Sequence, residues 1–157
     1  MKQHKRQFLH ILLACIWMIT IFWFSSRTGD DSSAQSSTIV GLIEDLLSSI
    51  RSHWSADTQQ AFVSIVTLLV RKAAHATEYL ILGLLFLGSQ SRNRPLKKAV
   101  PAAWILAVCY AATDEIHQYF VPGRACRFTD VIIDSCGAAA GLLVFCLIHR
   151  YRSRNKS

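Results

Sequence analysis

The chain has 157 residues, of which 52% are hydrophobic and 17% are charged, whereas soluble domains normally carry about a quarter charged residues. This composition favours a membrane protein over a soluble one. The net charge of +7 comes from basic residues that flank long apolar segments, which gives no support to nucleic-acid binding, and no nucleic-acid partner is predicted.

Four apolar runs follow one another along the chain, near residues 8–24, 62–88, 100–120 and 131–148. A helix needs about 20 residues to cross the ~30 Å hydrocarbon layer, and about 17 as a lower bound. Helices are expected rather than strands, because lipid leaves unpaired backbone groups unsatisfied and four runs cannot close a barrel. We predict an all-α fold with residues 1–157 as one domain, an integral membrane bundle of four transmembrane helices at about residues 8–24, 69–88, 100–120 and 130–149.

The first run follows a basic start and resembles the apolar part of a signal peptide. It ends in the bulky sequence IFWFSS, at the place where signal peptidase requires small residues. We therefore expect this segment to remain in the protein as a signal anchor.

Residues 25–61 form the first long connection. This connection begins with the polar sequence SSRTGDDSSAQSS and continues with TIVGLIEDLLSSI, in which apolar residues recur at helical spacing. Two interpretations remain open for the second part: a short amphipathic helix on the outer membrane face, or a solvated loop with one packed turn.

Basic residues cluster before the first run, in the connection 89–99 and after the fourth run, and none of these segments contains Asp or Glu. The positive-inside rule then predicts a multi-pass protein of the cell membrane with a cytoplasmic N-terminus, C-terminus and loop 89–99, and an external loop 25–61. All ten carboxylates would lie on the external side. We expect one polar pocket, open outward, and an inner half with almost no ionisable groups.

The stretch RKAAHATEYL interrupts the second apolar run with ionisable side chains. Arg71, His75, Glu78 and Tyr79 recur at i, i+4, i+7 and i+8, which places them on one helix face. An Asp, Arg or Lys near the centre of a span costs at least about 2.5 kcal/mol, so such residues within a span usually have a function.

The two cations of this stretch are expected to behave differently. Lys72 is predicted to extend to the outer interface. For Arg71 two alternatives stay open, the interface or a partner such as Glu78 or Asp134.

Polar residues also occupy the outer turns of the third run. Asp114, His117 and Gln118 lie at i, i+3 and i+4 on one face. Glu115 and His117 lie on different faces, so we do not expect both to point inward.

In the fourth run, Asp130, Asp134, Gly137 and Gly141 form one stripe, whose small residues permit close approach by a neighbouring helix. Asp130 also suits the N-cap of this helix. Arg124 lies beside a tight turn in VPGRACR and is suited to an anion contact.

The sequences RKAAHATEYLILG, YAATDEIHQYFVPGR and DVIIDSCGAAAG, together with FWFSS, resemble the blocks of the VanZ-like family of bacterial membrane proteins. The family is named for an accessory protein that lowers susceptibility to the glycopeptide antibiotic teicoplanin. The resemblance implies a bacterial cell-envelope protein without implying a settled biochemical activity. It also implies a set of recurring residues, which in this sequence are His75, Glu78, Tyr79, Asp114, Glu115, Gln118, Pro122, Arg124, Asp130 and Asp134.

Two functional interpretations remain open, beside a purely structural set of interhelical contacts. In the first, the pocket binds an anionic or amphiphilic molecule such as a membrane lipid, a cell-wall precursor or a glycopeptide, and Arg71, Arg124 and Arg127 clamp its acidic group. The predicted ligand-binding residues are Arg71, His75, Glu78, Tyr79, Asp114, Glu115, Gln118, Arg124, Asp130 and Asp134.

In the second interpretation the pocket is catalytic and acts on a lipid headgroup or cell-wall precursor, with His75, Glu78, Asp114 and Asp134 as candidates for general acid–base transfer. The same four side chains could hold a divalent ion, although no metal site and no cofactor is assigned. A transporter is disfavoured because the inner half offers no polar path. The five cysteines lack zinc or disulfide spacing, and the oligomeric state stays open.

Overall fold

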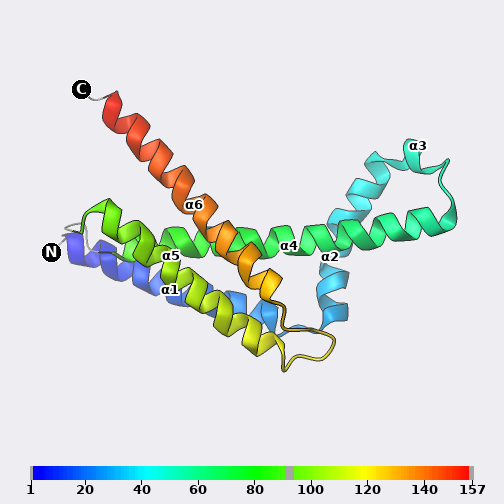
Figure 1. The fold of residues 1–157 in the computed structure, drawn as a ribbon, viewed down its shortest axis with the longest axis horizontal. Coiled ribbons are helices and arrows are strands. Elements are labelled where there is room, and N and C mark those ends of the chain that lie inside the picture. Colours follow the sequence, from blue (N-terminus) through cyan, green and yellow to red (C-terminus); the bar gives the residue numbers. More distant parts are fainter. Residues whose placement is uncertain (1, 91–93, 156–157) are drawn as a thin grey trace.

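The computed structural model describes residues 2–90 and 94–155, and all regular structure in these residues is helical. Six helices follow one another: α1 (Lys2–Ser25), α2 (Gly29–Leu46), α3 (Ser48–Arg51), α4 (Ala56–Ser89), α5 (Leu96–Gln118) and α6 (Phe128–Arg154) (Figure 1). No strand occurs in the described residues, so the predicted all-α fold class is confirmed.

Three of these helices are long and apolar enough to cross a membrane: His4–Ser25 within α1, Leu96–Gln118 and Phe128–Arg154. They correspond to the runs predicted at residues 8–24, 100–120 and 130–149. Each presents large apolar side chains at its surface, for example Phe8, Ile105 and Leu143, which is expected where lipid surrounds a helix. The three helices indicate a membrane protein.

The segment predicted as the second span, residues 69–88, is the second half of the much longer helix α4. With 34 residues α4 is about 51 Å long at 1.5 Å per residue. It is not among the three apolar helices, since Arg71, Lys72, His75 and Glu78 lower the hydropathy of its second half. The fourth span therefore stays a prediction.

A helix does form in the first long connection, which excludes the solvated loop. It begins earlier than predicted, inside the polar sequence, because Thr28 caps it: the Thr28 hydroxyl accepts the backbone N–H of Asp31 at 3.2 Å and donates to its carboxylate at 2.7 Å. The helix α2 packs against α4, and together with α3 and the first half of α4 it forms an arm that extends from the bundle (Figure 1).

The helices α4 and α6 cross at very short distance through small residues. A Cβ atom on Gly137 would lie 2.2 Å from the carbonyl oxygen of Ala76, and one on Gly141 would lie 2.8 Å from that of Leu80. The close approach predicted for the glycine stripe is thus confirmed. It brings the acidic start of α6 beside the polar face of α4.

Because Gly137 has no room for a side chain, we expect Gly137→Ala to push α6 away from α4 and destabilise the protein by about 1–3 kcal/mol, as overpacking typically does. Gly41→Ala is the matched control, since a Cβ at this position in α2 meets no atom within 4 Å and Ala favours helix. Thermal unfolding in detergent should show a lower midpoint for Gly137→Ala only. Equal midpoints for both variants would contradict the close crossing.

The ends of the bundle also bear on topology. The helix α1 begins and α6 ends at the same side of the molecule, on the left in Figure 1. Between them, α1 and α5 run away from this side and the second half of α4 runs back toward it (Figure 1).

Candidate functional site

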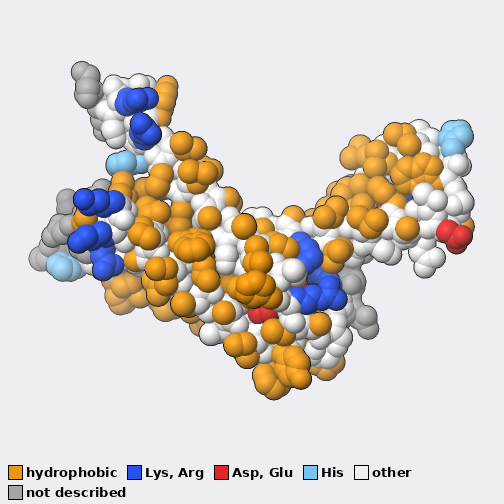
Figure 2. Space-filling view, viewed as in Figure 1, with side chains coloured by type: hydrophobic (Ala, Val, Ile, Leu, Met, Phe, Trp, Pro, Cys, Tyr) orange, Lys and Arg blue, Asp and Glu red, His pale blue; other side chains and the backbone are white. Residues whose placement is uncertain are grey.

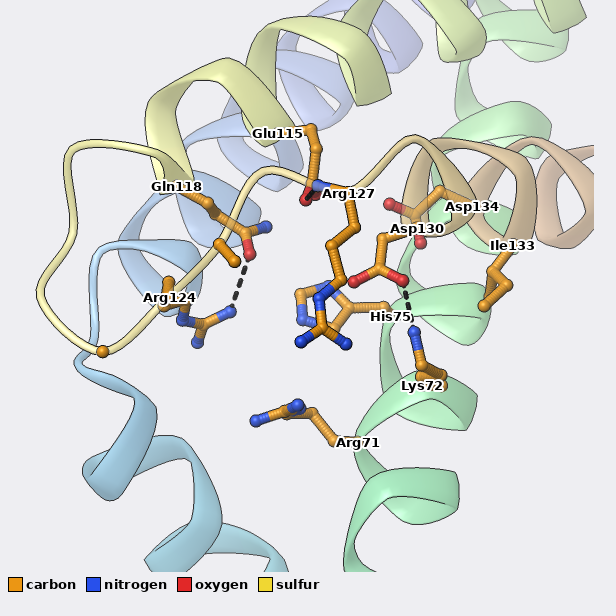
Figure 3. A pocket seen from close by; sticks show the side chains of 12 residues that line it. Arg71, Lys72, His75, Glu115, Gln118, Arg124, Arg127, Asp130, Ile133 and Asp134 are labelled. Carbon is orange, nitrogen blue, oxygen red and sulfur yellow. Dashed lines mark hydrogen bonds and ion pairs between the residues drawn. The ribbon is translucent and has the colours of Figure 1, made fainter.

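A cavity of about 100 Å³ opens where α4, the connection after α5 and the start of α6 meet (Figure 3). We call it the arginine cavity, because Arg71 of α4 and Arg124 and Arg127 of the connection line it. Lys72, His75, Glu115, Gln118, Asp130 and Asp134 also line it, so the structure brings together nine of the side chains singled out in the sequence, counting Lys72 and Arg127.

The three arginines turn their guanidinium groups toward the same space (Figure 3). None of the three forms an ion pair in the part of the chain that the structure describes. Burial, reinforced by the positive charge of Arg71, lowers the pKa of Arg124, although a guanidinium stays charged near neutral pH. Like charges that converge in this way favour an anion between them.

Arg124 is held in place by the end of α1 and by α5. Its Nε donates to the carbonyl of Arg27 at 2.9 Å, and its Nη1 donates to the side-chain oxygen of Gln118 at 3.0 Å. With a longer contact to the carbonyl of Phe24, at 3.4 Å, three of its five N–H groups are engaged. The remaining donors are available to a ligand.

Lys72, and not Arg71, makes the ion pair between α4 and α6. The Lys72 ammonium contacts the carboxylate of Asp130, a partner that the sequence analysis did not predict for it. Arg71 has no hydrogen bond or ion pair with Glu78, Asp134 or any other described residue. The reason is register: Lys72 is one residue further around α4 and faces the first turn of α6 (Figure 3).

Beneath the arginine cavity lies a buried hydrogen-bond network centred on Asp114. One carboxylate oxygen accepts from the hydroxyl of Ser25 at 2.8 Å and from the amide of Gln118 at 3.1 Å. Since Gln118 also holds Arg124, the network links α1, α5 and the arginine cavity. Its side chains are almost fully buried, with Asp114 only 2% exposed.

Glu115 is the neighbour of Asp114 that points inward. It is 2% exposed and accepts the backbone N–H of Arg127 at 2.6 Å, which fixes the connection in front of α6. His117 lies on another face, as expected, where its ring stacks on Phe22 at 4.1 Å and its Nε2 lies 3.0 Å from the Ser26 hydroxyl. His117 therefore belongs to the junction with α1 and does not line the cavity.

Several buried polar atoms of the predicted site have no hydrogen-bond partner among the described residues. They are His75 Nδ1, Glu78 Oε2, Tyr79 Oη, Asp114 Oδ1 and Asp134 Oδ1. His75 Nδ1 and Glu78 Oε2 approach within 3.4 Å without forming a hydrogen bond. Buried polar groups are normally paired, so unpaired ones clustered on α4, α5 and α6 indicate a missing ligand, proton or water.

A second cavity of about 250 Å³, here the side cavity, shares Arg71, His75 and Arg124 with the arginine cavity and has Glu78 in its wall. The helix α2 contributes to it, which the sequence interpretation missed. Ser32 and Ser36 of α2 are 8% and 7% exposed and line it, together with the apolar Phe24, Ile39 and Val70. The i, i+4 spacing of the two serines is the signal that could have revealed this face.

No group of three or more His, Cys, Asp or Glu side chains is arranged to hold a metal ion in residues 2–90 and 94–155. His75, Glu78, Asp114 and Asp134 therefore do not form a ready site for a divalent ion. All five cysteines are free.

A third cavity, described below, lies at the opposite end of the bundle. It corrects the expectation of a single polar pocket.

The model of the VanZ/LLP1 family matches residues 9–149 of this chain. The chain belongs to the VanZ/LLP1 family. The match includes the arginine cavity, the side cavity and the Asp114 network, so the resemblance of the sequence blocks to VanZ-like proteins is confirmed. No curated protein and no solved structure matches the chain.

Proposed function

We propose that this VanZ/LLP1 protein crosses the cell membrane four times, with residues 69–88 of α4 as the fourth span and both termini in the cytoplasm. The support is geometric: the chain begins and ends at the same side of the bundle, which requires an even number of crossings (Figure 1). Basic residues at that side agree with the positive-inside rule (Figure 2). At about 51 Å, α4 exceeds the ~30 Å hydrocarbon layer, so its first half extends outside with α2.

On the external side, the arginine cavity is proposed to bind the anionic head group of an amphiphilic envelope molecule. The observation that carries the proposal is the convergence of Arg71, Arg124 and Arg127 without acidic partners of their own. Guanidinium groups suit the bidentate recognition of phosphate and carboxylate. The role served by this binding is cell-envelope physiology or tolerance of teicoplanin-type glycopeptides.

The sizes of the arginine cavity and the side cavity indicate a ligand that has a small head group joined to an apolar part. A volume of about 100 Å³ accommodates a group of the size of a phosphate and is far too small for a glycopeptide. The side cavity adds about 250 Å³ with the apolar walls of Phe24, Ile39 and Val70. A lipid head group or a lipid-linked cell-wall precursor matches this combination better than the antibiotic itself.

A second candidate function is that of an enzyme acting on the same molecule, as a hydrolase or transferase. The specific observation is that His75, which lines both the side cavity and the arginine cavity, lies 3.4 Å from Glu78 in the wall of the side cavity. A carboxylate beside an imidazole suits general acid–base transfer at a bound phosphate. A lipid or cell-wall product that appears with wild type and disappears with Glu78→Gln would establish this alternative.

Binding is tested with purified protein in phosphatidylcholine nanodiscs, to which short-chain phosphatidylglycerol or a short-chain polyprenyl-phosphate-linked precursor is added. We expect saturable binding by wild type and a loss of about tenfold in affinity for Arg71→Gln, because one charge-assisted contact contributes about 1.5–3 kcal/mol. Lys98→Gln removes the same charge at the other end of the bundle and should bind as wild type does. Equal affinity of Arg71→Gln and wild type would overturn the proposal.

A further inference from the structure

A cavity larger than the arginine cavity and the side cavity lies away from the site described above. It has a volume of about 620 Å³ and is enclosed by α1, the end of α4, the start of α5 and α6, at the side where α1 begins and α6 ends. We call it the terminal cavity. Its volume falls within the range of about 300–1,000 Å³ that ligand sites usually have.

The ionisable side chains that line the terminal cavity are two arginines and two histidines. Arg6 and His10 come from α1, Arg94 from the connection before α5, and His149 from α6. None of them makes an ion pair with a described residue. The segments that build this end of the bundle, residues 1–29, 79–113 and 135–157, contain no Asp or Glu, so no acidic side chain of these segments can pair with Arg6 or Arg94.

The rest of the wall is apolar. Leu87 of α4 and Phe145 of α6, with further leucines, extend from the basic rim into the bundle. A cavity with a cationic rim and an apolar interior between membrane helices is complementary to a molecule with an anionic head and an acyl chain.

Local contacts join the segments that line the cavity. The side chain of Gln7 donates to the carbonyl of Ser89 at 3.1 Å, which joins α1 to the end of α4. A Cβ on Gly88 would lie 2.0 Å from the His10 ring, so the imidazole fits against α4 only because this residue is glycine. The side chain of Arg94 donates to that of Gln90 at 2.8 Å with one of its five N–H groups.

From this arrangement we propose that the terminal cavity is a binding site for an anionic phospholipid. The phosphate lies among Arg6, His10, Arg94 and His149, and the acyl chain lies along Leu87 and Phe145. With the topology proposed above, the lipid comes from the cytoplasmic leaflet. This site is separate from the arginine cavity and shares no residue with it.

The test uses the full chain in nanodiscs made of equal parts phosphatidylglycerol and phosphatidylcholine, with retained lipids counted by native mass spectrometry. We expect the wild-type protein to retain phosphatidylglycerol in preference to phosphatidylcholine. In Arg6→Gln/Arg94→Gln the ratio of retained phosphatidylglycerol to phosphatidylcholine should fall about tenfold. Arg150→Gln/Arg154→Gln removes the same charge from α6 outside the cavity and should keep the preference. Arg6→Lys/Arg94→Lys should restore most of it.

Two outcomes overturn the proposal. If Arg6→Gln/Arg94→Gln and Arg150→Gln/Arg154→Gln lose the preference for phosphatidylglycerol equally, the lipid is attracted by the basic surface as a whole and not by the terminal cavity. If inorganic phosphate binds the wild-type protein and the amount of retained phosphatidylglycerol falls as the phosphate concentration rises, the site serves a soluble phosphate compound instead. Should the double variant fail to fold, the single variant Arg94→Gln, in the connection outside the helices, tests the same site.

Discussion

A Gram-positive host that produces the wild-type protein is expected to tolerate more teicoplanin than the same host producing Arg71→Gln. In the structure Arg71 has no hydrogen bond or ion pair of its own with the described residues, and it lines both the arginine cavity and the side cavity. Its loss should therefore spare the fold and remove the anion contact. We expect Arg71→Gln to return the host to the susceptibility of one that lacks the protein.

The control for this experiment is Lys98→Ala, which removes a cation at the opposite end of the bundle and should leave tolerance unchanged. Membrane levels of each variant are compared by immunoblot. Undiminished tolerance in Arg71→Gln at equal protein level would mean that the arginine cavity does not serve this function. If the wild-type protein itself gives no tolerance, teicoplanin tolerance is not a function of this protein. The proposal that the arginine cavity binds an anionic head group is then tested by the nanodisc binding experiment alone.

Replacing Asp134 with asparagine is expected to stabilise the protein while abolishing its function. Asp134 is 3% exposed, and its Oδ1 has no hydrogen-bond partner among the described residues, although it lies in the wall of the arginine cavity. An unpaired buried polar or charged group costs about 1–3 kcal/mol or more, whereas an amide of the same shape carries no charge to desolvate. We expect Asp134→Asn to raise the free energy of unfolding by an amount in this range.

This result would distinguish a functional carboxylate from a structural one. Thermal unfolding in detergent should show a higher midpoint for Asp134→Asn, and the binding and tolerance assays should show a loss of activity. Asp57→Asn is the control, because Asp57 is an exposed acid in the first turn of α4 and should change neither stability nor activity by much. A lower midpoint for Asp134→Asn would show that the carboxylate is paired in the native protein and supports the bundle.

Much of the architecture was predictable because it depends on local sequence. Long apolar runs predict helices in lipid, because a helix satisfies its backbone hydrogen bonds within the segment. Three of the four runs are helices apolar enough to span a membrane. The i, i+3 and i+7 spacing likewise predicts a common face for Asp134, Gly137 and Gly141, and all three are buried where α4 and α6 cross. The Thr28 cap that lengthens α2 is also local, although its hydroxyl was not recognised in the sequence as a helix start.

Pairings across helices were not predictable in the same way. Spacing along one helix determines which side chains share a face, while the side chain that reaches them from a neighbour depends on the crossing angle and the relative shift of the two helices. Lys72 instead of Arg71 therefore meets Asp130, and Ser25 of α1 meets Asp114 across 89 residues of sequence. The same limit hid the contribution of α2 to the side cavity.

The sequence by itself determined that this is a helical membrane protein of the VanZ/LLP1 family, with charged residues on three helical segments, because apolar runs, helical spacing and family blocks are properties of neighbours along the chain. Only the tertiary structure decided which of those charges are paired, which converge without partners, and that a basic cavity lies at the other end. The physical reason is that a charge is stabilised or left unpaired by whatever packs against it, and packing between helices brings together residues far apart in the chain.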